Sequence, residues 1–87
     1  MKYRFPALLK ADKYDPIFTV ITFPDLFGIG GECERGKEEA TAKEILGLVL
    51  KDSYYRGFEP TNIDYLKKRF PDYRVIMVEV DIDDEVC

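Results

Sequence analysis

The stretch GECERGK, residues 31–37, has the spacing of a nucleotide-binding loop, G-x-x-x-x-G-K. A strand-like run precedes it and a helix-like segment follows, which is the setting in which such a loop binds phosphate. However, Glu38 stands where that loop needs a hydroxyl for magnesium, and Glu32 and Glu34 inside it would repel a phosphate. The chain is also short for the parallel sheet that supports these loops. We therefore interpret the glycines as serving backbone geometry.

A second possible chemistry is a cluster of carboxylates. Acids from three predicted elements could converge, as they do in two-metal nucleases: Asp12 at a strand end, Glu39 or Glu44 on a helix, and Asp81 on the last strand. The competing interpretation is that each is a solvated surface acid, because 17 of the 87 residues are acidic. A divergent metal-dependent nuclease is therefore an alternative function. It requires these carboxylates to lie within about 4–5 Å of a shared metal pair.

The usual catalytic groups are missing from the sequence. There is no histidine, the commonest general base and the commonest nitrogen ligand of metals. The two cysteines, Cys33 and Cys87, are not at metal-binding spacing, and we expect free thiols. We predict no catalytic residue, no metal and no cofactor, and we expect that the protein is not an enzyme.

Charge is unevenly distributed along the chain. The 17 acidic and 13 basic residues give a formal net charge of −4, and the 46% hydrophobic content is typical of a globular protein. Four acids lie in residues 81–87, so residues 1–80 are formally neutral. A neutral body with an acidic tail is expected to attract a basic partner, not nucleic acid. No apolar run approaches the ~20 residues of a spanning helix, so we expect no membrane association and a cytoplasmic location.

Hydrophobic patterning predicts an α+β fold with the element order β-β-β-α-(α)-β. The predicted strands cover residues 3–11, 17–23, 27–34 and 73–82, and the predicted helices cover 37–55 and, capped by Thr61 or Asn62, 63–70. Pro6 cannot donate to a strand ladder, so the first strand should be an edge or point that position outward. The last strand is apolar on both faces, which is typical of an interior strand.

Aromatic residues are abundant, with six tyrosines and six phenylalanines. They could form stacking platforms for single-stranded nucleic acid. Yet the strand aromatics alternate with polar residues and lack a surrounding basic patch, apart from Lys67-Lys68-Arg69. We interpret the aromatics mainly as core residues.

The run FTVITFPDLFGIGGE, residues 18–32, resembles the HicB family of toxin–antitoxin antitoxins. The resemblance covers nearly the whole chain and rests on these segments: Tyr3 to Ala7 for the family's opening, Phe23-Pro24-Asp25-Leu26 for its signature, Glu38-Glu39-Ala40 and Ala42–Leu46 for its helix, and Phe70-Pro71-Asp72 before its last strand. Two departures stand out. Phe27 replaces the usual proline after Leu26, and residues 28–35 replace a Thr-Gln-Gly-Asp-Thr-like segment.

The resemblance implies a partial ribonuclease-H-like fold without that enzyme's activity, in which one long helix packs on a mainly antiparallel sheet. It implies an antitoxin-like homo-oligomer that neutralises a small basic HicA-type toxin, an enzyme that cleaves messenger RNA, by masking its surface. A solitary HicB-like domain with another partner is a further alternative.

The same resemblance sets the expected organisation. Residues 1–82 would form the HicB-like globular domain and residues 83–87 an acidic tail. Many family members continue into a DNA-binding domain, whereas this chain stops at Cys87, so no such domain and no direct DNA binding are expected. The residues predicted to meet the partner are Asp25, Glu32, Glu34, Glu38, Glu39, Asp81, Asp83, Asp84 and Glu85.

Overall fold

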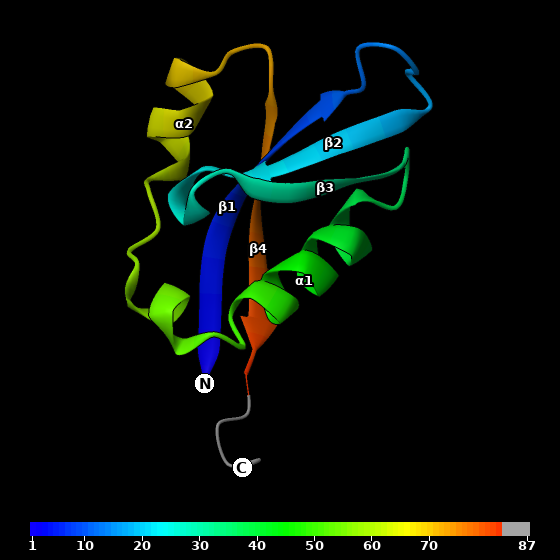
Figure 1. Ribbon diagram of the computed structural model, residues 1–87. Helices are drawn as coiled ribbons and strands as arrows, with labels where there is room; N and C mark the ends of the chain where they lie inside the picture. The colour runs from blue at the N-terminus through cyan, green and yellow to red at the C-terminus, as the bar shows by residue number, and fades with distance from the viewer. Residues whose placement is uncertain (83–87) are drawn as a thin grey trace.

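The computed structural model describes residues 1–82, in which four strands form one sheet in the order β3-β2-β1-β4 with every pair antiparallel (Figure 1). The predicted α+β class and element order are confirmed. The strands are β1 (Lys2–Ala11), β2 (Phe18–Phe23), β3 (Ile29–Glu34) and β4 (Arg74–Asp81), the α-helices are α1 (Glu38–Val49) and α2 (Ile63–Arg69), and two short 3-10 helices are η1 (Pro24–Leu26) and η2 (Ser53–Gly57).

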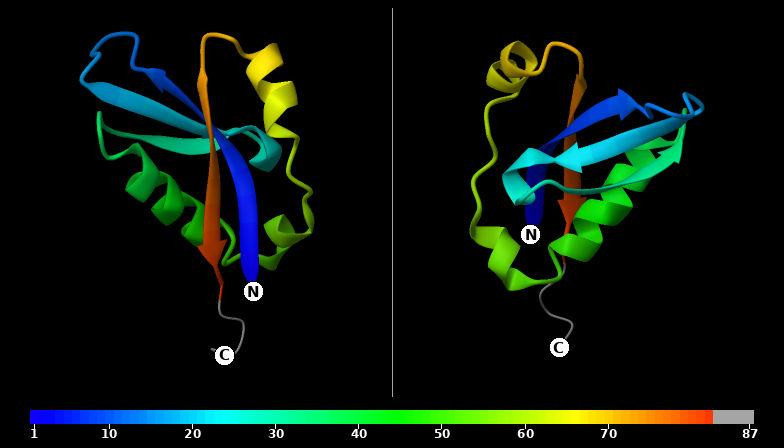
Figure 2. Two further views of the ribbon diagram at one scale, coloured as in Figure 1. Left: turned by 180° about the vertical axis from the view of Figure 1, so that it is seen from behind. Right: turned by 45° about the horizontal axis from the view of Figure 1, so that its top comes forward.

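The sheet consists of a long ladder and a hairpin that crosses it. β1 and β4 pair along most of their lengths, from Lys2–Asp81 to Leu9–Arg74. β2 pairs with β1 only from Leu8 to Ala11, and β3 pairs with the whole of β2, from Phe18–Glu34 to Phe23–Ile29. Figures 1 and 2 show the hairpin crossing the ladder near one end, with α1 and α2 on opposite sides of the sheet.

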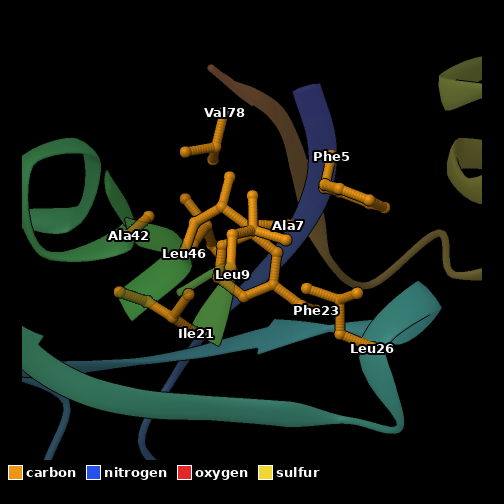
Figure 3. Packing of buried hydrophobic residues seen from close by; sticks show 10 residues of the cluster. Phe5, Ala7, Leu9, Ile21, Phe23, Leu26, Ala42, Leu46 and Val78 are labelled. Atoms are coloured by element: carbon orange, nitrogen blue, oxygen red, sulfur yellow. The ribbon is translucent and has the colours of Figure 1, made fainter. Parts of the chain in front are cut away.

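The main core lies between the sheet and α1 (Figure 3). Odd-numbered residues of β1 and β2 face this helix, since side chains alternate along a strand. Leu46 of α1 and Val78 of β4 meet them there. The fully or nearly fully buried residues are Phe5, Ala7, Leu9, Ile21, Phe23, Leu26, Ala42, Leu46, Leu50 and Val78.

A second, smaller core lies under α2 on the other side of the sheet. Leu66 of α2 packs there against Leu8 and Val75. This cluster covers the β1–β4 side of that face. On the β2 side, Phe18 is half-buried and Val20 is 36% exposed. Two helices therefore pack on the sheet, one on each face, instead of the single long helix that the resemblance implied.

The glycines of β3 permit close packing, as the sequence predicted. A Cβ atom on Gly30 would lie 1.8 Å from the carbonyl oxygen of Ile21 on the neighbouring strand. A Cβ atom on Gly31 would lie 3.0 Å from Cδ1 of Ile45, a residue of α1. Glycine at these two positions therefore lets the hairpin close and lets α1 approach it.

The predicted helix over residues 37–55 is wrong at its C-terminal end. α1 ends at Val49, and Asp52 adopts an extended conformation with φ −82° and ψ 115°. Its carboxylate accepts a hydrogen bond from the backbone N–H of Tyr54, 3.0 Å away, which starts η2. Aspartate competes with helix propagation in this way, because its short side chain caps a new turn. At α2, the predicted cap is confirmed as Asn62.

The interior position expected for the last strand is wrong, and of the two options expected for the first strand, an edge position or an outward-pointing Pro6, the edge position is wrong. β1 lies inside the sheet and β4 at its edge. Pro6 is nevertheless compatible with the fold, because it precedes the Leu8–Ala11 segment that pairs with β2 and so has only β4 as a neighbour. The edge rule holds for this part of β1, while the strand as a whole is interior.

Candidate partner-binding surface

The acids predicted to contact a partner differ in whether they are bonded within the fold or exposed. Six of the nine lie in the described part of the chain, whereas Asp83, Asp84 and Glu85 lie outside it. Asp25 and Glu38 form hydrogen bonds within the fold, and the other four are exposed, with Asp81 also bound to the N-terminal ammonium.

Asp25 is one of the two internal acids. It lies in η1, and its carboxylate accepts a hydrogen bond from the backbone N–H of Thr61, 2.8 Å away, and another from the Thr61 hydroxyl. Both oxygens are thereby engaged with the segment that leads into α2. Asp25 therefore connects η1 to the segment that precedes α2.

Glu38 is the other internal acid, and only 7% of the residue is exposed. Oε2 accepts from the hydroxyl of Thr19 at 2.8 Å, and Oε1 accepts from the backbone N–H of Gly36 at 2.9 Å. Hydrogen bonds from its own backbone N–H and from Thr19 lower the pKa of the Glu38 carboxyl. Glu38 thus fastens the start of α1 to β2 and is not available to a partner.

The same contact bears on the nucleotide-loop pattern. The backbone N–H of Gly36 donates to the Glu38 carboxylate, although a phosphate-binding loop would offer such groups to phosphate. Lys37, the lysine of the pattern, lies with Nζ 3.8 Å from Glu34. The geometry supports the interpretation that these glycines serve the backbone, as Gly36 does with a φ of 101°.

Glu32, Glu34 and Glu39 are exposed. Glu32 lies beside Asp12, whose carboxylate raises the pKa of Glu32, while the pKa of Asp12 is lowered by the same side-chain hydrogen bond. Glu34 lies on the same face of β3 as Glu32, because the two are separated by one residue of a strand. These acids can therefore present negative charge to a basic partner.

Asp81 lies far from Asp12, which bears on the nuclease alternative. The Asp81 carboxylate is 2.9 Å from the N-terminal ammonium, and this hydrogen bond lowers the pKa of Asp81. Asp81 pairs with Lys2, whereas Asp12 follows the other end of β1, so about 30 Å separates them at ~3.3 Å per strand residue. The two carboxylates cannot share a metal pair. Within residues 1–82, no three His, Cys, Asp or Glu side chains are grouped to hold a metal ion.

An unpredicted feature is a group of aromatic rings on the surface, which we call the aromatic patch: Phe27, Tyr54, Tyr55 and Phe58. Phe27 is 71% exposed and Tyr54 60% exposed. Their rings stack with centroids 6.4 Å apart and an interplanar angle of 17°. Tyr55 and Phe58 are half-buried and pack against the main core, so the exposed rings rest on an anchored base.

Phe27 is held in an unusual backbone conformation. Its φ of 59° and ψ of 26° are left-handed, and it is the one non-glycine residue among the described residues with a positive φ. Such a conformation costs an L-residue roughly 1–2 kcal/mol. In this conformation, the large apolar side chain of Phe27 lies at the surface, immediately after the Phe-Pro-Asp-Leu signature.

Sequence patterning missed the aromatic patch because its members come from residues 27 and 54–58. The expectation that aromatic residues are mainly core residues holds for Phe5 and Phe23 and is wrong for Phe27 and Tyr54. The local signal was the pair of tyrosines inside the predicted helix, which do not fall on its apolar stripe.

Comparisons with known proteins do not assign the chain to a family: no family model, no curated protein and no solved structure matches it. Separately, no helix within residues 1–82 has the length and apolar character that a membrane crossing requires.

Proposed function

We propose that the protein is an antitoxin-like binding module that acts in the cytoplasm on a small basic HicA-type toxin, covering the surface with which the toxin cleaves messenger RNA. The aromatic patch is the observation that carries this proposal. The HicB resemblance suggests the class of partner, and the antiparallel sheet with α1 on one face is compatible with a partial ribonuclease-H-like HicB fold.

The aromatic patch has the properties of a binding hot spot. Tyrosine and phenylalanine are enriched at protein interfaces, where they bury much area and lose little side-chain entropy. Two of the four rings are more than half exposed, and the other two are fixed by the core. Backbone strain such as that at Phe27 persists where the surrounding structure requires it, and it clusters at functional sites. We therefore assign the patch the central contact with the partner.

The exposed acids have a supporting role. Glu32, Glu34 and Glu39 carry charge that attracts a basic partner, and exposed charges mainly accelerate association. Asp25 and Glu38 are removed from the predicted contact set because their carboxylates are engaged within the fold.

The proposed contact differs from the family pattern at one position. The family usually has proline after the signature leucine, and proline, whose φ is near −65°, cannot adopt the φ of 59° found at Phe27. The η1 turn of this chain therefore has its own conformation, and the proposal gives Phe27 a contact that a proline at this position could not make.

The proposal is tested by co-purification with the product of the adjacent gene, followed by calorimetry and an RNA-cleavage assay. The double variant Phe27→Ser/Tyr54→Ser removes both exposed rings of the patch. Tyr14→Ser is the matched control, because Tyr14 is 89% exposed and lies in the turn between β1 and β2.

We expect a stable complex in which cleavage is silenced. The double variant should bind about 10- to 100-fold more weakly, as truncated hot-spot residues do, while the control binds like the wild type. If the chain elutes alone and cleavage continues, the toxin is not its partner, and the alternative of a solitary HicB-like domain with another partner is favoured. If the complex forms and the double variant binds as well as the control, the aromatic patch is not the contact.

A further inference from the structure

β4 has the sequence of an interior strand and the position of an edge strand. Its residues from Val75 to Val78 are all apolar and point alternately to both faces of the sheet. Proteins protect exposed edges with charges, prolines or bulges, because an open apolar edge pairs with other strands. The central part of β4 carries none of these devices.

The hydrogen bonds at one end of the β1–β4 ladder show which backbone groups face outward. The N–H of Ile82 donates to the carbonyl of Met1 at 2.8 Å, and the Met1 nitrogen donates to the carbonyl of Ile82 at 2.9 Å. Met1 and Ile82 therefore form a hydrogen-bonded pair, and such pairs alternate with non-hydrogen-bonded pairs along an antiparallel ladder. Even-numbered residues of β4 accordingly point their backbone groups at β1, and odd-numbered residues point theirs away.

Pro6 agrees with this assignment. It lies opposite Met77, and in a non-hydrogen-bonded pair no N–H is required of the proline. The outer edge of β4 therefore presents the backbone N–H and C=O groups of Val75, Met77, Glu79 and Asp81.

The opposite edge of the sheet is better protected. The N–H of Arg35 donates to the carbonyl of Ile17 at 2.8 Å, so by the same alternation the outward residues of β3 are Gly30, Glu32 and Glu34. Two of these three carry carboxylates, which repel a second β3. Each edge has one carboxylate beside a cation, since Glu34 lies 3.8 Å from Nζ of Lys37 and Glu79 lies 3.5 Å from Nε of Arg4. The edges differ in their central residues, because β3 carries the charged Glu32 there and β4 carries apolar residues from Val75 to Val78.

The β4 edge is also complementary to itself. If two copies pair antiparallel about a two-fold axis at Val78, Met77 lies opposite Glu79 of the partner subunit and Val75 lies opposite Asp81 of the partner subunit. All four outward residues then find hydrogen-bonding partners, and no two like charges face each other directly. On the α1 side, half-buried Ile76 meets Val80 of the partner subunit.

We propose that two copies of the chain associate through their β4 edges in this register and form one continuous sheet. The occupant of the edge is a second copy, because the pairing is self-complementary and needs no chemistry that the chain lacks. This inference does not depend on the proposed toxin partner.

The first test is the solution mass, measured by sedimentation and by light scattering over a concentration series. We expect a dimer of the 10.1 kDa chain that dissociates on dilution, as mass action requires. Met77→Pro removes an outward N–H from the β4 edge and should give a monomer. Glu32→Pro removes an outward N–H from the β3 edge and is the matched control, which should remain dimeric.

A second measurement uses the wild type alone, so it stands even if a proline variant does not fold. Hydrogen exchange should show protection at the backbone N–H groups of Met77 and Glu79 that weakens on dilution, while those of Gly30 and Glu32 exchange rapidly throughout. A monomer at all concentrations, rapid exchange along the β4 edge, or dissociation by Glu32→Pro and not by Met77→Pro would overturn the proposal.

Discussion

Carboxylates with the same chemistry have different roles in this protein because their surroundings differ. Glu38 and Glu39 are adjacent in sequence, yet Glu38 is buried and fully hydrogen-bonded while Glu39 is exposed. Both carboxylate oxygens of Asp25 accept hydrogen bonds from Thr61. Only the residues left at the surface can interact with a partner, and sequence alone did not separate the two groups.

Replacing Glu38 by glutamine tests its structural role. Glutamine keeps one oxygen that accepts and replaces the other by an amide group that cannot, so one of the two hydrogen bonds and the charge are lost. This should lower the free energy of unfolding by about 1–3 kcal/mol at pH 7. Because the pKa of Glu38 is lowered in the folded state, its contribution is complete above the usual glutamate value of about 4.3 and is lost as the pH falls through the lower folded value. The difference between wild type and variant, measured by urea unfolding, should therefore shrink in acid. Glu39→Gln should change stability little, and an equal loss in both variants would contradict this role.

The Asp12 and Glu32 pair gives a second prediction at this scale. Asp12 raises the pKa of Glu32, so Asp12→Asn should bring the pKa of Glu32 down toward its usual value. Asparagine retains an oxygen that can accept from the backbone N–H groups of Tyr14 and Asp15, so the turn should persist. Titration of the side-chain carboxyl by NMR measures the shift. An unchanged pKa for Glu32 would show that the two carboxylates do not interact.

Among the elements, η1 is followed by Phe27, the only described non-glycine residue with a positive φ, and this conformation can be tested directly. Phe27→Pro should destabilise the fold by more than about 1 kcal/mol, because proline cannot adopt a φ of 59°. Phe27→Gly accepts that conformation without strain and is the control. Thermal unfolding measures both variants, and a proline variant as stable as the glycine variant would mean that the turn can take another conformation.

The types of the elements and their order could be predicted from local patterning. Which strands lie side by side in the sheet could not. Period-two alternation placed β1, a run of β-branched and aromatic residues placed β2, and the apolar stripe placed α1 to within one residue of its start. The break at Asp52 was missed because a capping aspartate competes with a helix that is otherwise regular. The edge position of β4 depends on which strands pair, which alternation within one strand does not encode. The aromatic patch depends on contacts between residues 27 and 54–58 and was missed for the same reason.

At the scale of the whole molecule, the charge of −4 resides mainly in the last residues of the sequence. Removing residues 83–87 takes away three acids, Asp83, Asp84 and Glu85, and leaves 14 acidic against 13 basic residues. With the basic partner of the proposed function, this truncation should slow association severalfold and change the lifetime of the complex little, if these charges act by long-range attraction, which mainly sets the association rate. Stopped-flow kinetics at low and high salt measure the effect, which should fade as salt screens it. Equal losses in association rate and lifetime would contradict steering.

The pairing of β1 with β4 also determines when the sheet can be completed. Lys2 meets Asp81, so the contact joins residues from opposite ends of the described chain. The hairpin of β2 and β3 and the helix α1 are local and can form early, while the ladder must wait until β4 is available and until a long loop has closed. Until then, the Lys2–Ala7 segment of β1 has no neighbouring strand to pair with. This order of events makes the final strand the step that commits the chain to its native structure.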